Sequence, residues 1–156
     1  MTEVKIATGA GQPKNRTGET AAYAGDEADT VGLTTNNGEV EVVAADAASG
    51  SAQPCVGILF GPVTDLSSYS DELNELARRT AKAERTTLGD RIAFVRYGVV
   101  VENVDADWGF TENEPVYLAE GGGFTQTKPS DSGDLVQVLG VALGPETVWL
   151  DVEAEY

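Results

Sequence analysis

The sequence lacks histidine altogether, and it has a single cysteine, Cys55, among 156 residues. Without histidine the chain is missing the usual general base, the Ser-His-Asp and Cys-His catalytic arrangements and the commonest zinc ligand. A lone cysteine forms no disulfide within the chain. Because Cys55 follows Pro54 and opens the apolar run 56–60, we predict a small core residue and not a nucleophile. We therefore expect a protein that is not an enzyme and needs no cofactor.

Basic residues and long apolar runs are also scarce. Lysine and arginine number 10 against 26 acidic residues, which gives a net charge of −16 at pH 7. This charge argues against binding to nucleic acid or to an anionic membrane. No run of about 18 apolar residues is present to span a bilayer, and residues 1–5 lack the pattern of a secretory signal. We expect a soluble protein made inside a cell and not exported through a signal peptide.

The acidic composition resembles that of proteins from salt-loving organisms. Acidic residues extend over both ends of the chain, and threonine, alanine, glycine and valine are abundant. In molar salt the Debye length falls to about 3 Å, so the repulsion between like charges is largely screened. The alternative interpretation is an ordinary acidic protein.

Short apolar stretches separated by glycine turns predict a mainly β fold. Two such stretches within residues 31–44 flank Asn36-Asn37-Gly38, and Asn-Gly is typical of a tight hairpin. A similar pattern begins again at residue 116, and both copies end in an apolar strand closed by Gly-Pro, at Gly61-Pro62 and Gly144-Pro145. Two repeated strand-turn-strand units predict a small β-barrel or sandwich, and chance similarity between two glycine-rich segments is the alternative.

One segment, 70–86, has the pattern of a short helix. Ser70 offers an N-cap, acidic residues follow it, and basic residues stand near the other end. Residues 1–24 lack sustained periodicity and contain several glycines, which is typical of an extended N-terminal arm. We expect the arm at 1–24 and a single β-rich domain at 25–156 with a helical insertion at 70–86.

Four basic side chains of the predicted helix stand out in an acidic chain. They are Arg78, Arg79, Lys82 and Arg85. We select them as partner-binding candidates, because a basic patch can dock onto an acidic partner. A solvated helix surface is the alternative.

A possible calcium loop lies at Asn103, Asp105, Asp107 and Glu114, which match positions 1, 3, 5 and 12 of the EF-hand loop. The glycine that this loop requires comes one position late, at Gly109, and the flanking residues predict strands instead of helices. We therefore predict an acidic loop in solvent and no metal site, with weak cation binding as the alternative.

Two further groups of residues allow more than one interpretation. Asp131 and Asp134 form a carboxylate pair of the kind that glycosidases use, although such pairs arise readily by chance among 26 acids. The aromatic side chains are equally suited to the core or to anchoring a partner; they are Trp108, Tyr117, Phe124 and Trp149. For Trp149, inside the apolar segment 148–152, we predict the core.

Several of these segments together resemble one family. The segments are Asn-Glu-Pro-Val-Tyr-Leu at 113–118, Gly-Phe-Thr-Gln-Thr at 123–127, Ser-Gly-Asp-Leu-Val-Gln at 132–137 and Leu-Gly-Val-Ala-Leu at 139–143, with a weaker first copy at Gly25-Asp26 and 31–33. This series is similar to the capsid decoration, or cement, proteins of tailed viruses. The helical segment 70–86 is not part of the family pattern.

The resemblance implies a non-enzymatic virion protein that binds the outer surface of an icosahedral capsid. Such a protein is often a homotrimer at local three-fold positions. It stabilises contacts between major capsid protein subunits by binding free energy that is spread over many copies. Together with the composition, it implies a virus of a halophilic host. The alternatives are another virion part, such as a tail tube, turret or fibre base, and a halophilic cation- or ligand-binding β module.

Overall fold

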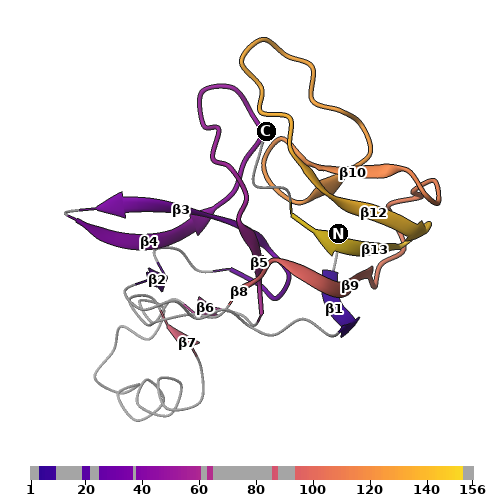
Figure 1. The fold of residues 1–156 in the computed structure, drawn as a ribbon, viewed down its shortest axis with the longest axis horizontal. Coiled ribbons are helices and arrows are strands. Elements are labelled where there is room, and N and C mark those ends of the chain that lie inside the picture. Colours follow the sequence, from indigo (N-terminus) through magenta and orange to yellow (C-terminus); the bar gives the residue numbers. More distant parts are fainter. Residues whose placement is uncertain are drawn as a thin grey trace, which may run out of the picture.

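The fold is mainly β, which confirms the predicted class. The computed structural model describes residues 4–9, 19–21, 25–36, 38–60, 63–64, 86–87 and 94–152, and these residues form thirteen strands in three sheets (Figure 1). Two of the sheets are large and curled, and they share the core.

The larger sheet has six strands, and every neighbouring pair is antiparallel. In spatial order the strands are β1 (Val4–Gly9), β9 (Tyr97–Asn103), β13 (Thr147–Asp151), β12 (Val138–Gly144), β10 (Pro115–Leu118) and β11 (Phe124–Thr125). Strands from both ends of the chain therefore lie in one sheet.

The second sheet has five strands, of which only the outermost pair, β2 and β4, is parallel. In spatial order they are β2 (Glu19–Ala21), β4 (Glu39–Ala44), β3 (Thr30–Asn36), β5 (Gly57–Leu59) and β8 (Phe94–Val95). A separate parallel pair consists of β6 (Val63–Thr64) and β7 (Thr86–Thr87).

The β3–β4 hairpin forms at the predicted turn. Asn36 pairs with Glu39, and Gly38 has a φ of 84°, a value that glycine adopts without steric cost. The remaining pairs continue regularly from Thr35 and Val40.

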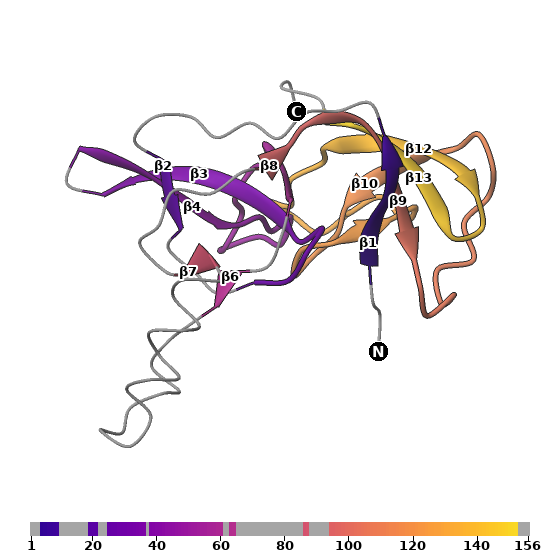
Figure 2. The same ribbon diagram turned by 90° about the horizontal axis from the view of Figure 1, so that it is seen from below.

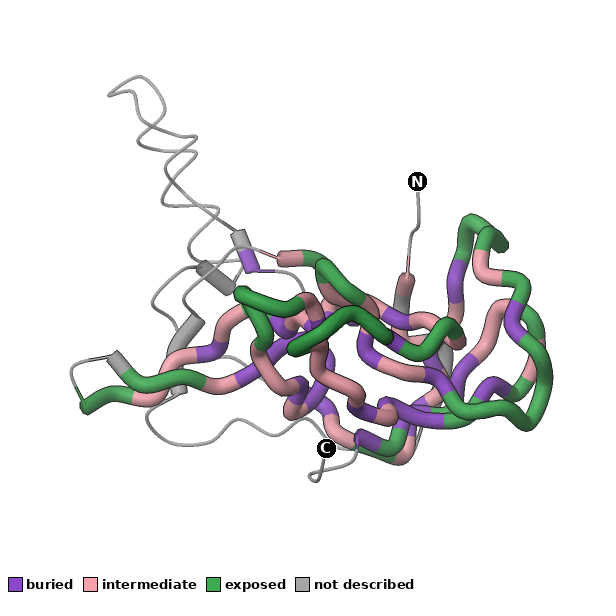
Figure 3. The backbone as a smooth tube through the Cα atoms, turned by 90° about the horizontal axis from the view of Figure 1, so that it is seen from above, coloured by how far each residue is buried: buried purple, intermediate pink, exposed green. Residues whose placement is uncertain are grey.

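The chain passes from one large sheet to the other at Arg96, the only residue between β8 and β9 (Figure 2). Strands β9, β10 and β13 alternate between buried and more exposed side chains, as expected when one face of a sheet covers a core. The main cluster joins Ile58 and Val95 of the five-stranded sheet to Val101 and Leu150 of the six-stranded sheet. Buried residues thus follow the strands, and exposed residues concentrate in the loops and at the β3–β4 hairpin tip (Figure 3).

Two predicted elements meet the structure only in part. The predicted helix at 70–86 lies outside the described residues except for Thr86, which begins strand β7. Within the predicted arm, Val4–Gly9 forms β1 and pairs with β9, while Glu19–Ala21 forms β2 and pairs with β4. At these two places the N-terminal segment is therefore extended and paired with strands of the two large sheets.

Candidate functional site

Two loops lie side by side at one end of the molecule, residues 45–55 and 126–137 (Figure 1). The backbone N–H of Ser49 donates to Oδ1 of Asp134 at 2.9 Å, and the N–H of Leu135 donates to the carbonyl of Ala47 at 2.8 Å. These bonds connect the two loops directly.

A buried amide also joins the loops at their base. Gln137 is 1% exposed, its Oε1 accepts the backbone N–H of Cys55 at 2.7 Å, and its Nε2 donates to the carbonyl of Cys55 at 2.7 Å. The Cys55 thiol donates to the carbonyl of Gly57, and burial raises its pKa to about 12. A buried thiol that keeps its proton is a poor nucleophile. The prediction of a small core residue at Cys55 is confirmed.

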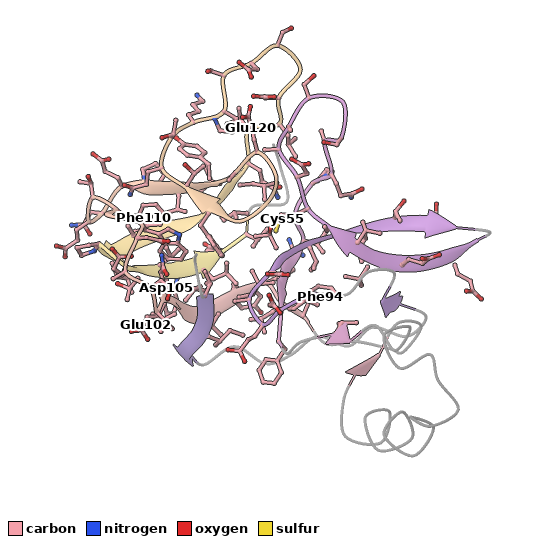
Figure 4. All side chains as sticks on the ribbon, turned by 180° about the vertical axis from the view of Figure 1, so that it is seen from behind. Cys55, Phe94, Glu102, Asp105, Phe110 and Glu120 are labelled. Atoms are coloured by element: carbon pink, nitrogen blue, oxygen red, sulfur yellow. The ribbon has the colours of Figure 1, made fainter. Side chains whose placement is uncertain are left out.

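Four acidic residues gather where these loops meet the turn at 119–123; we call them the acidic junction, consisting of Asp46, Glu120, Asp131 and Asp134. Ligand atoms of the last three lie within 4.8 Å of one another, the only such group of three among the described residues. Figure 4 shows Glu120 beside the two loops, with Cys55 closer to the strands. Asp131 and Asp134, which the sequence already suggests as a carboxylate pair, are thus joined by Glu120 and Asp46 from other segments.

Asp46 is held in the acidic junction by three hydrogen bonds. Oδ1 of Asp46 accepts the N–H groups of Ala48 and Gly121, and Oδ2 accepts the hydroxyl of Ser51. Burial acts to raise the pKa of Asp46, but these three donors together hold it below its ordinary value of 3.8.

The pKa values of Asp134 and Glu120 shift in opposite directions. A hydrogen bond between their carboxyl groups raises the pKa of Glu120 and lowers that of Asp134. Donors from Ser49 and Asp131 lower the pKa of Asp134 further. Carboxylate oxygens are suitable ligands for hard cations. The oxygens of Asp134, however, already accept backbone N–H groups from Ser49 and Asp131. These hydrogen bonds connect the loops and are enough to explain why the acidic residues lie together.

The outward side of the six-stranded sheet carries exposed apolar side chains. Val141 pairs with Trp149 and Trp149 with Val100, so these three side chains form a row across β12, β13 and β9. Trp149 is 42% exposed and Val141 38%, while Leu143, two positions further along β12, is 45% exposed.

Acidic residues border this row. On one side Thr147 pairs with Glu102, and on the other Asp151 pairs with Tyr97, which is itself 58% exposed. We call the surface formed by Tyr97, Val100, Val141, Leu143 and Trp149 the outer face. Contiguous exposed apolar patches with polar borders mark interaction sites.

The prediction that Trp149 belongs to the core is wrong. Its neighbours Val148 and Leu150 are fully buried, and strand alternation places Trp149 with Asp151 on the opposite side. This alternation is visible in the segment Val148-Trp149-Leu150-Asp151 and could have identified the outer face.

The other aromatic candidates lie elsewhere. Phe124 is buried, and Trp108 packs against the core, stacked on Phe110 with ring centroids 4.8 Å apart. Tyr117 is half-buried in β10.

Among the described residues, the acids of the possible calcium loop do not form a group of carboxylates that could hold a metal ion. Asn103 is buried at the end of β9, where its Oδ1 accepts the N–H of Asp105 and its Nδ2 donates to Asp107. Glu114 is exposed next to β10. Glu146 instead accepts the N–H groups of Trp108 and Gly109, which holds this loop against the β12–β13 turn. The four basic candidates Arg78, Arg79, Lys82 and Arg85 lie outside the described residues.

Comparison of the chain with protein-family models, with curated proteins and with solved structures gives no match. Within the part of the chain that the structure describes, no helix is long and apolar enough to cross a membrane.

Proposed function

We propose that this chain is a non-enzymatic structural protein of a virus particle, which binds the outer surface of an icosahedral capsid and stabilises contacts between major capsid protein subunits. The observation that carries the proposal is the outer face, an apolar row on a molecule with a net charge of −16. A strongly charged surface keeps a protein soluble, so a contiguous apolar row with Trp149 at its centre needs a partner to cover it.

The two similar segments of the sequence have similar strand arrangements, which supports the proposal. The first copy gives the neighbours β4-β3-β5, and the second gives β11-β10-β12. In each case a hairpin is extended by a third, antiparallel strand on the side of its first strand. The segments that resemble decoration proteins correspond to β10, β11, the loop 126–137 and β12.

The finer parts of the proposal are a homotrimer at local three-fold positions, a location on the outside of the virion and a halophilic host. The first two come from the resemblance, and the third from the acidic composition. The basic residues Arg78, Arg79, Lys82 and Arg85 remain candidates for a second contact with an acidic capsid surface.

The test is a binding measurement on capsids that lack this protein, in molar salt, with the bound copies counted against the major capsid protein. We expect Trp149→Ala to weaken binding about tenfold or more, since central aromatic side chains dominate interface energies. Phe60→Ala is the matched control, because Phe60 is a similarly exposed aromatic residue, at 47%, next to β5 in the other large sheet.

Three outcomes would overturn the proposal. Equal losses for the two variants would remove the outer face from the contact. Only a few copies of the unmodified chain per purified particle would indicate a tail or vertex component, and none would favour the ligand-binding alternative.

A further inference from the structure

An open cavity of about 360 Å³ lies between the two large sheets, away from the outer face. Its walls come from β1, from the segment 28–30, from the end of β4 and from the turn 121–124, and Trp108 completes them. The volume is at the lower end of the range for small-molecule sites, which is about 300–1,000 Å³.

Among the described residues that line the cavity, Asp29 is the one with an ionisable side chain. It is half-buried, and its Oδ2 accepts the N–H of Asp26 at 2.9 Å. Among the described residues no hydrogen bond is formed to its other oxygen, Oδ1. Burial raises the pKa of Asp29, and the nearby charge of Asp26 acts in the same direction. A positive group in the cavity would relieve both effects, because it compensates the charge of a half-buried carboxylate.

The glycine wall of the cavity offers no donors for an anion. The N–H of Gly121 donates to Asp46, that of Gly122 to the carbonyl of Ala119, and that of Gly123 to the hydroxyl of Thr30. All three backbone donors are therefore in use. A divalent metal is equally unsuited, since one carboxylate falls far short of the oxygen ligands that calcium requires.

The aromatic part of the lining suits the carbon chain of a ligand. Trp108 packs edge-on against Phe124, with ring centroids 5.5 Å apart, and both residues line the cavity. Aromatic rings bind hydrocarbon by contact and also attract cations.

We propose that this cavity binds a small organic cation, a primary ammonium or guanidinium group on a short carbon chain, with Asp29 as its charged partner and Trp108 and Phe124 as its apolar wall. The group can belong to a free amine or to a lysine or arginine side chain of a partner protein. The proposal is independent of the capsid-binding function, and it is tested on the isolated chain.

The experiment uses the fluorescence of Trp108. Trp149→Phe leaves Trp108 as the single tryptophan of the chain, and this background is titrated with n-butylammonium at constant molar salt. Molar salt screens the loose attraction of cations to an acidic surface but acts much less on a half-buried pair. A saturable change with n-butylammonium is expected, together with a much weaker response to the uncharged 1-butanol.

Two variants distinguish a specific ion pair between Asp29 and the ligand from a general attraction of cations to the acidic surface. Asp29→Asn keeps an acceptor for the N–H of Asp26 and should weaken binding about tenfold, as expected for a hydrogen bond to a charged group. Asp26→Asn removes the same charge three residues away, outside the lining, and should change the affinity less than about twofold. A capped lysine peptide that binds as well as n-butylammonium would identify a protein side chain as the source, and binding of the free amine alone would identify a small molecule.

The proposal is overturned if n-butylammonium and 1-butanol bind equally, if Asp26→Asn weakens binding as much as Asp29→Asn, or if the titration does not saturate. None of these results depends on capsid binding, so this inference and the proposed function fail separately.

Discussion

Replacing Gln137 by leucine tests whether the buried amide that joins the two loops is essential to the fold. Leucine has a similar size but neither donates nor accepts, so the N–H and the carbonyl of Cys55 lose partners that lie at 2.7 Å. A buried polar group without a partner costs about 1–3 kcal/mol, so the two groups together cost about 2–6 kcal/mol. This is a large part of the 5–15 kcal/mol that typically stabilises a domain.

The chain provides a matched control in Gln126. Its amide makes the same two-point contact with a backbone, accepting the N–H of Thr111 at 2.7 Å and donating to its carbonyl at 2.9 Å. This contact is exposed, so water can replace the amide, and Gln126→Leu should cost less than about 1 kcal/mol.

The measurement is urea unfolding of both variants in molar salt. The free energies of unfolding are compared with the same slope of free energy against urea concentration for each variant. Losses of similar size for Gln126→Leu and Gln137→Leu would refute the reasoning, because they would show that burial of the contact does not determine its energy.

Three further perturbations follow from the geometry. Cys55 should react with a thiol reagent only after unfolding, and rapid labelling of the native protein would contradict its burial and its raised pKa. Because burial raises the pKa of Cys55 from 9.0 to about 12, the contribution of its protonated thiol to stability is fully present below pH 9 and is lost between pH 9 and 12. Gly140→Ala should cost about 1–3 kcal/mol by thermal unfolding, because its Cβ would lie 2.0 Å from the carbonyl oxygen of Trp149, whereas Gly144→Ala meets only the Thr147 hydroxyl at 3.2 Å and should cost less. Asp46→Ala leaves three donors without their acceptor and should cost about 1–3 kcal/mol in urea unfolding, whereas Asp46→Asn retains one acceptor oxygen and should recover part of this loss.

Local patterns were sufficient to predict the strands but not their neighbours. The turn at Gly38 and the short apolar stretches predict β3, β4, β10, β12 and β13 in nearly their observed places. The pairing of β9 with both β1 and β13 brings together residues far apart in the chain, and no local pattern specifies such contacts. The same reason explains why Val4–Gly9, which has little periodicity within a glycine-rich segment, was predicted as part of an arm.

The candidate sites show the same division. Asp131 and Asp134 are close in sequence and form a visible pair, but Glu120 and Asp46 join them only because three separate loops meet. Asp29 and Trp108 approach one cavity from different parts of the fold, so no spacing in the sequence indicates it. The outer face differs, because the alternation of buried and exposed positions around Trp149 is local and visible in the sequence.

The acidic junction and the outer face make the same demand on the solvent, which is high ionic strength. In the junction, carboxylate oxygens within 4.8 Å of one another repel, and a hydrogen bond that raises the pKa of Glu120 relieves only part of this repulsion. Molar salt reduces the Debye length to about 3 Å, which screens part of this repulsion, so salt should favour the closed loops. The proposed binding through the outer face, which Glu102 and Asp151 border, should gain from the same salt. Salt would screen the repulsion of these charges from an acidic partner and would not weaken the apolar contact. A single condition, high ionic strength, is therefore expected to stabilise the loops at one end of the molecule and to favour the proposed association through the outer face.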